Sequence, residues 1–140
     1  MTDIEAMLRH HEGERLTPYV DSVGKVTIGI GRNLTDKGIS AEECRSFLYR
    51  DIADAMEDVL HCFSCYDQLS RPRQLVLVSM AYNLGRAKLA KFVRFIGAVH
   101  LGKWDEAADE LLDSKAAKQD APARYQQLAK MMRENVSVWV

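Results

Sequence analysis

Residues 12–31 read EGERLTPYVDSVGKVTIGIG, and this stretch decides the fold class of the chain. One proline and three glycines interrupt its apolar residues, at positions 18, 24, 29 and 31. That texture is typical of short, twisted strands joined by turns. We therefore predict a hairpin turn at residues 21–24 and a second strand over residues 25–30.

Helices are predicted on both sides of this strand region. Residues 3–12 carry apolar side chains at helical spacing, and Gly13 can end that helix as its C-terminal cap. On the other side, Ser40 and Glu43 have the spacing of a capping box, which marks a helix start. One apolar stripe follows along this helix, at Phe47, Leu48, Ile52, Met56, Val59, Leu60 and Phe63.

The second half of the chain is predicted to be helical. We expect four helices, over residues 71–85, 87–99, 103–113 and 121–140. The first of these is apolar almost throughout, which indicates burial on all sides, and Gly85 should end it. In the third helix, Trp104 and Leu112 are expected among the inward-facing side chains.

The expected fold class is α+β, in one domain of residues 1–140. A small N-terminal β lobe over about residues 13–38 would be joined by a long helix, about 40–63, to a larger all-helical lobe, about 70–140. Helix 3–12 is expected to pack back on the helical lobe, because an isolated helix of that length is marginal in water.

Composition limits the class of protein. Hydrophobic residues make up 47% of the chain and charged residues 28%, which is ordinary for a soluble globular protein. No apolar run approaches the roughly 20 residues of a membrane span, and the N-terminus lacks the basic start of a secretory signal. We therefore expect synthesis in the cytoplasm without an export address.

The cysteines and the charge distribution add two expectations. The three cysteines, at positions 44, 62 and 65, follow no disulfide framework, so reduced structural thiols are expected, with no metal site and no cofactor. Residues 1–60 hold seven Lys/Arg and twelve Asp/Glu, whereas residues 61–140 hold twelve and eight. A basic half favours an anionic partner, and an acidic half argues against broad coating of nucleic acid.

Three polar side chains near the strands could perform acid–base chemistry. Cleaving a bond between two sugars needs a proton for the leaving oxygen and help for the attacking water. Glu12, at a helix end and against an apolar sheet edge, is the candidate acid, because burial favours the protonated form of a carboxyl group. Asp21 is the candidate base, and Thr27 could hold the water. Taken singly, each has an ordinary structural reading as a solvated helix end, a turn former or a strand residue.

The order of these residues is more specific than any one of them. It resembles the signature of the phage T4-type lysozymes in three motifs, Glu12-Gly13, Tyr19-x-Asp21 and Thr27-Ile28-Gly29-Ile30-Gly31. Later segments also resemble helices of that family, at residues 51–59, 80–85, 103–108 and 122–124. The resemblance implies a lysozyme-like fold and a muramidase that cuts the β-1,4 bond between N-acetylmuramic acid and N-acetylglucosamine in bacterial peptidoglycan.

The resemblance implies a role for each matching residue. Glu12 would be the general acid, Asp21 would position or activate the water, and Thr27 would hold it on the far face of the sugar, which gives inversion. It further implies substrate binding by Gly31, Asn33 and Tyr82, and support of the catalytic acid by Arg124. Core packing competes as an explanation for Tyr82, and an ordinary surface position competes for Arg124.

One position departs from the family pattern. The best-known member has a histidine where this chain has Arg32, so a permanent charge replaces a titrating one. Four cations of the basic half are expected either to help hold the anionic wall polymer or to form a solvated helix face, at Arg86, Lys88, Lys91 and Arg94.

The implied partner is the glycan strand of peptidoglycan, cut by a monomeric enzyme during lysis of the phage host. Because the substrate lies outside the cytoplasmic membrane, a holin-type lesion would release the enzyme, and no membrane insertion is expected. Alternatives are a catalytically silent wall-binding member and a module of a longer phage protein, although the start at Met1 and the terminal helix favour a self-contained chain. A DNA-binding regulator is disfavoured by the net acidic charge and by the apolar segment before Gly85.

Overall fold

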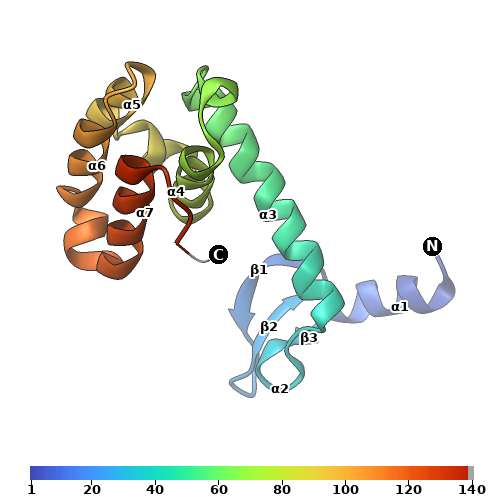
Figure 1. The fold of residues 1–140 in the computed structure, drawn as a ribbon. Coiled ribbons are helices and arrows are strands. Elements are labelled where there is room, and N and C mark those ends of the chain that lie inside the picture. The colour runs from blue at the N-terminus through green and yellow to red at the C-terminus, as the bar shows by residue number, and fades with distance from the viewer. Residues whose placement is uncertain (139–140) are drawn as a thin grey trace. The chain divides into compact units, whose positions relative to one another are not determined.

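The computed structural model describes residues 1–138 and divides the chain into two units, Met1–Phe47 and Leu48–Val140. The first unit combines helices with a three-stranded sheet (Figure 1). Its elements are α1 (Asp3–Glu12), β1 (Arg15–Val20), β2 (Val26–Gly29), β3 (Arg32–Asn33) and α2 (Leu34–Lys37). The long helix α3 (Ala41–Cys62) begins in the first unit and continues in the second.

Local sequence closes α1 at both ends. Thr2 and Glu5 form a capping box, in which Thr2 Oγ1 accepts from Glu5 N at 3.1 Å and Glu5 Oε2 accepts from Thr2 N at 2.9 Å. Gly13, with a φ of +71°, donates its N–H to Arg9 O at 3.0 Å. The predicted end at Gly13 is confirmed, and it leaves Glu12 as the last residue of the helix.

The sheet is antiparallel, with strand order β1-β2-β3. The predicted turn is confirmed, because Gly24 N donates to Asp21 O at 3.1 Å and Asp21 N donates to Lys25 O at 2.9 Å. The second strand is shorter than predicted and ends at Gly29, whose φ of +71° turns the chain toward β3. Neither β3 nor α2 was predicted, since two and four residues are too few to show a period.

Helix α3 starts as predicted, and its apolar stripe is buried only in part. Ser40 Oγ accepts from Glu43 N at 3.1 Å and Glu43 Oε1 accepts from Ser40 N at 3.0 Å, so the capping box is confirmed. Val59 and Phe63 are fully buried, whereas four other members of the stripe are exposed, namely Phe47, Leu48, Ile52 and Leu60.

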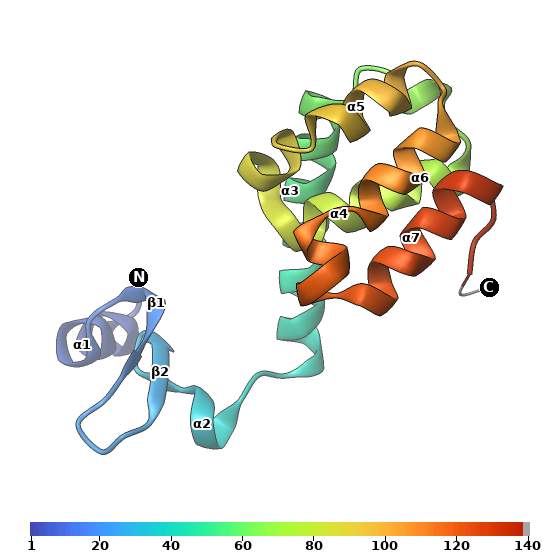
Figure 2. The ribbon, with the colours of Figure 1, turned by 90° about the vertical axis from the view of Figure 1, so that its left-hand side faces the viewer.

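The second unit is helical (Figure 2). After α3 it contains η1 (Tyr66–Gln68), α4 (Arg71–Ala90), α5 (Val93–His100), α6 (Trp104–Leu112), η2 (Ala116–Asp120) and α7 (Pro122–Glu134). Helix α6 packs against both α5 and α7, and α7 also packs against α4. Buried side chains from all of these helices form the core of the unit, with Phe63, Leu77, Phe95, Leu111, Tyr125 and Met131 among the largest.

Of three predictions for the helices, one is confirmed and two are wrong. Gly85 interrupts α4 with a φ of 77° and a ψ of 170°, so the predicted end there is confirmed even though helical residues follow directly. The single helix predicted over 87–99 is wrong, because the chain leaves helical geometry at Phe92 (ψ 56°) before α5 begins. The last helix ends at Glu134, where Asn135 takes a left-handed conformation, and the predicted extension to residue 140 also falls on residues 139–140, outside the described part.

The expected burial of α4 on all sides is also wrong. Val76, Leu77 and Met80 are fully buried, but Tyr82 and Asn83 are exposed. In α6, likewise, Leu112 is exposed although it was expected to face inward, and Trp104 is partly buried.

Arg73 fastens the end of α7 to α4 and α6. Its Nε donates to Met132 O at 2.8 Å and its Nη2 to Arg133 O at 3.3 Å, which satisfies two carbonyls at the end of α7. The same guanidinium lies 4.0 Å from the centre of the Trp104 ring.

The α+β class predicted from the sequence is confirmed, with a small antiparallel sheet and a helical remainder.

Tyr125 gives a stability prediction for this core. Its side chain is fully buried, and its hydroxyl has no hydrogen-bond partner among the described residues. Because a buried, unpaired hydroxyl costs about 1–3 kcal/mol, Tyr125→Phe should raise the free energy of unfolding by about 1 kcal/mol in urea titrations. Tyr125→Leu, which leaves a void as well, should lower it. Destabilisation by the phenylalanine would show that the hydroxyl is satisfied.

Candidate active site

The carboxyl group of Glu12 lies directly against Gly31. A Cβ atom placed on Gly31 would stand 2.6 Å from Glu12 Oε2 and 2.9 Å from its Cδ, so a side chain there would force the Glu12 carboxyl group to shift. Gly31 also has a φ of +69°, a conformation that glycine adopts without strain. The carboxyl group of Glu12, at the end of α1, therefore contacts the backbone of Gly31 in the turn between β2 and β3. The expected burial of Glu12 is not observed, since the residue is exposed.

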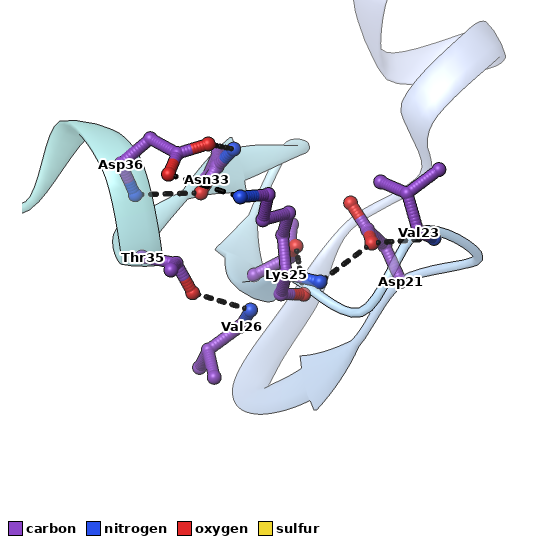
Figure 3. A network of polar contacts seen from close by, with 8 residues as sticks. Asp21, Val23, Lys25, Val26, Asn33, Thr35 and Asp36 are labelled. Atoms are coloured by element: carbon purple, nitrogen blue, oxygen red, sulfur yellow. Dashed lines mark hydrogen bonds and ion pairs between the residues drawn. The ribbon is translucent and has the colours of Figure 1, made fainter.

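Asp21 is held by the backbone of its own turn. Its Oδ1 accepts from Val23 N and from Lys25 N, each at 2.9 Å (Figure 3). Two amide donors on one oxygen fix the orientation of the carboxylate. The turn-forming role and the proposed catalytic role of Asp21 are therefore compatible, because a carboxylate has a second oxygen that the turn does not use.

Thr27 sits on the central strand and is 4% exposed, the one buried polar residue in the described part of the chain. Its Oγ1 donates to Lys25 O at 3.0 Å. Asp21 and Thr27 are thus both tied to the same residue, one through the N–H of Lys25 and the other through its carbonyl. The structure brings these two predicted site residues together.

Asn33 is paired with Thr27 across the sheet, but its side chain caps helix α2. The register pairs Thr27 with both Tyr19 and Asn33, which puts the three side chains on one face. Asn33 caps α2, with its Oδ1 accepting from Asp36 N at 3.0 Å and its Nδ2 donating to Asp36 Oδ2 at 2.9 Å. Both ends of its amide are therefore engaged, and substrate binding by Asn33 stays a prediction.

Arg32 forms a two-point ion pair with the capping residue of α3. Its Nη2 lies 2.7 Å from Glu43 Oε2, and its Nη1 donates to Glu43 Oε1 at 3.0 Å. Together with the hydrogen bond from Ser40, this guanidinium lowers the pKa of Glu43 from 4.5 to about 2. The predicted permanent charge at Arg32 thus ties the sheet to the start of α3.

Tyr82 and Arg124 belong to the second unit, on α4 and α7, and both are exposed. Substrate binding by Tyr82 and support of Glu12 by Arg124 would involve residues of different units, and both stay predictions. The same holds for packing of α1 on the helical lobe.

The four cations Arg86, Lys88, Lys91 and Arg94 share their surroundings with acidic side chains, and their predicted roles, wall binding or a solvated helix face, stay predictions. Arg86 lies 2.9 Å from Asp58 Oδ1 and 3.6 Å from Glu57 Oε1. Lys88, Lys91 and Arg94 line a cavity of about 600 Å³. That cavity also carries three acidic residues, so it is not a purely cationic surface; its charged lining is Lys88, Lys91, Arg94, Glu110, Asp113, Lys115 and Asp120.

Sequence reasoning did not identify Lys25, Thr35 and Asp36 as contributors to the site. Lys25 Nζ lies 3.2 Å from Asp36 Oδ1, and Thr35 Oγ1 accepts from Val26 N at 2.8 Å (Figure 3). The spacing of Asn33 and Asp36, which is that of a helix cap, is the signal that could have located α2 and these contacts.

Residues 1–138 were also searched for metal-binding clusters and membrane-spanning helices. No group of three histidine, cysteine or acidic side chains there is placed to bind a metal ion. No helix in that part combines the length and the apolar character needed to cross a membrane. The three cysteines are free, and burial raises the pKa of Cys62 and of Cys65.

A small antiparallel sheet that holds a carboxylate and a hydroxyl, with a helix-end carboxyl on its glycine turn, is an arrangement suited to a glycoside hydrolase. The family model described as phage lysozyme matches residues 9–133. The chain therefore belongs to the phage lysozyme family, and its activity is that of a lysozyme, a glycoside hydrolase.

Individual relatives agree with this assignment. "Probable T4-type lysozyme 2" of Dictyostelium discoideum is 27% identical and aligns with 81% of this chain and 84% of its own length. "Probable T4-type lysozyme 1" of the same organism is 23% identical with the same coverage. "Pre-baseplate central spike protein Gp5" of Enterobacteria phage T4 is 30% identical over 72% of this chain but only 22% of its own length.

The contact of Glu12 with Gly31 predicts an effect on activity. Gly31→Ala should displace the Glu12 carboxyl group and lower kcat about tenfold or more, because misplaced catalytic groups cost that much. Gly29→Ala is the matched control, since Gly29 has a similar φ of +71° but nothing within 4 Å of its added Cβ. Both variants should lose about 1–2 kcal/mol in urea unfolding, the cost of alanine in a left-handed conformation. Equal loss of kcat in the two would contradict the role of the contact.

The ion pair of Glu43 predicts a pH dependence of stability. Because folding lowers the pKa of Glu43 from 4.5 to about 2, its contribution is fully present above about pH 4.5 and is lost as the pH falls toward 2. The stability difference between the unmodified chain and Glu43→Gln, measured by urea unfolding, should shrink over that window. Glu42→Gln, which removes a neighbouring charge outside this network, is the control. A difference that stays constant from pH 6 to pH 2 would contradict the prediction.

Proposed function

We propose that this lysozyme is a muramidase that cleaves the β-1,4 bond between N-acetylmuramic acid and N-acetylglucosamine in peptidoglycan. The observation that carries the proposal is the shared attachment of Asp21 and Thr27 to the peptide groups of Lys25, which holds a carboxylate and a hydroxyl in one place on the sheet. Glu12 would act as the general acid toward the leaving oxygen, and Asp21 would activate or position the water.

The hydrogen-bond directions at Thr27 support its role as a water ligand. A threonine hydroxyl has one proton, and Thr27 gives that proton to Lys25 O. Toward a water molecule the Thr27 hydroxyl can therefore act only as an acceptor. The ionised Asp21 carboxylate is likewise an acceptor only. A water held by both would donate its two hydrogens to them and keep its lone pairs for the sugar carbon. The pair would thus orient a nucleophile as well as bind it.

Inversion is the stereochemical outcome that we propose. Inverting glycosidases separate their carboxyl groups by roughly 6.5–9.5 Å to leave room for water. Asp21 stands beside the start of β2, and Glu12 contacts Gly31 just after its end. The two carboxyl groups therefore meet opposite ends of this four-residue strand rather than the same end, which supports a separation that leaves room for water.

The remaining parts of the proposal concern the biological setting. The partner would be the peptidoglycan glycan strand, with Gly31, Asn33 and Tyr82 as further substrate contacts and Arg124 as support for Glu12. The enzyme would act as a monomer, without nucleic acid and without insertion into a membrane. It would serve in lysis of a phage host, reaching the wall from the cytoplasm through a holin-type lesion.

The clearing of a peptidoglycan suspension tests the assignment of roles. Glu12→Gln and Asp21→Asn should each slow clearing by about 10²–10⁴-fold, the usual contribution of a general acid or base. Asparagine keeps an oxygen that can accept from Val23 N and Lys25 N, so the turn should persist. Glu14→Gln, which removes a nearby exposed carboxylate paired with Arg9, should clear at the normal rate.

Product analysis separates the finer claims. Mass spectrometry should find N-acetylmuramic acid at the new reducing end, and NMR during early turnover should show the α anomer first. Normal clearing by Glu12→Gln would remove it as the acid, and an initial β anomer would replace inversion by retention.

A further inference from the structure

We propose that Thr35 and Asp36 of the short helix α2 are positioning residues for the pair Asp21 and Thr27. Neither contacts that pair directly. Each contacts the segment Lys25–Val26, through which the pair is held (Figure 3). This inference rests on the proposed roles of Asp21 and Thr27.

The peptide groups of Lys25 are the point where both site residues are held. The N–H of Lys25 donates to Asp21 Oδ1 at 2.9 Å, and its carbonyl accepts from Thr27 Oγ1 at 3.0 Å and from Asp21 N at 2.9 Å. A shift of this residue would therefore move the carboxylate and the hydroxyl together. Catalytic geometry is sensitive to such shifts, since displacements of about 1 Å can cost a hundredfold in rate.

The side chain of Lys25 is restrained by α2. Its Nζ lies 3.2 Å from Asp36 Oδ1, while the other oxygen of Asp36 accepts from Asn33 Nδ2 at 2.9 Å. Because Asn33 Oδ1 also accepts from Asp36 N, the carboxylate of Asp36 is fixed on its helix before it meets Lys25. The cap of α2 and the restraint on Lys25 are thus one continuous set of contacts.

Thr35 restrains the neighbouring residue from the same helix. Its Oγ1 accepts from Val26 N at 2.8 Å. Val26 directly follows Lys25 and precedes Thr27. The two contacts of α2 therefore lie on either side of the Lys25–Val26 peptide group, whose carbonyl accepts from the buried Thr27 hydroxyl. We refer to Thr35, Asp36 and their contacts with Lys25 and Val26 as the α2 clamp.

The clamp sits on an exposed part of the fold, which limits the size of its effect. The side chains of Lys25 and Asp36 are 37% and 57% exposed, so their ion pair is partly screened by solvent and salt. Loss of either contact should lower kcat about two- to fivefold, and loss of both about tenfold. KM should change little, because the clamp orients the water rather than the sugar.

The test compares kcat and KM on soluble glycan fragments, measured well below the melting temperature of every variant. Thr35→Val removes the acceptor at constant shape, Asp36→Ala removes the ion pair, and the double variant removes both. Thr35→Ser retains the hydroxyl and should restore kcat, and Lys37→Ala controls for general effects on α2. NMR should show the amide of Lys25 shifting in Thr35→Val and Asp36→Ala but not in the controls.

The outcomes distinguish the clamp from the active-site assignment. A double variant with kcat within 1.5-fold of the unmodified chain and an unshifted Lys25 amide would overturn the clamp. Glu12→Gln and Asp21→Asn are assayed alongside, and full activity in both would overturn the proposed function instead. A lower melting temperature with unchanged kcat would reduce the α2 contacts to a purely structural role, which also overturns the proposal.

Discussion

The arrangement of the site depends on the hydrogen bonds that Asp21 Oδ1 accepts inside its own turn. These two bonds close the hairpin between β1 and β2, and that hairpin sets where Thr27 stands on the central strand. A carboxylate can do this and still offer its second oxygen to water, which a hydroxyl or an amide does less well. The fold and the proposed chemistry therefore share one side chain.

Each of the two units is stabilised internally by a different kind of interaction. In the first unit, polar contacts dominate: Thr27 is its one buried residue, and ion pairs link Arg32 with Glu43 and Lys25 with Asp36. In the second unit, a core of apolar side chains supplies most of the stability, with the guanidinium of Arg73 closing the end of α7. Acid and salt should act mainly on the first kind of contact.

Features encoded over a few residues could be predicted from the sequence. The end of α1 at Gly13, the turn at Asp21 and the capping box of Ser40 and Glu43 depend on side chains three or four positions apart, and all three are present. Glu12, Asp21 and Thr27 were found because their order matches a known signature.

What could not be predicted depends on partners that are distant in the chain or on elements too short to show a period. The exposure of Tyr82 depends on which face of α4 meets the core, and at the break the Phe92 ring packs against Phe95 and the core, neither of which the local apolar pattern records. Asn33 could be placed near the site, but only the structure shows its amide turned toward Asp36.

The absence of a side chain at Gly31 has a consequence for how this site can change over evolutionary time. The surface that the Glu12 carboxyl group meets at Gly31 is main chain, so a mutation of this glycine can only add atoms that push the carboxyl group away. We therefore expect variation of the site to fall on the surrounding side chains rather than on this glycine. The site thus combines side chains that mutation can exchange with one backbone surface that mutation can only obstruct.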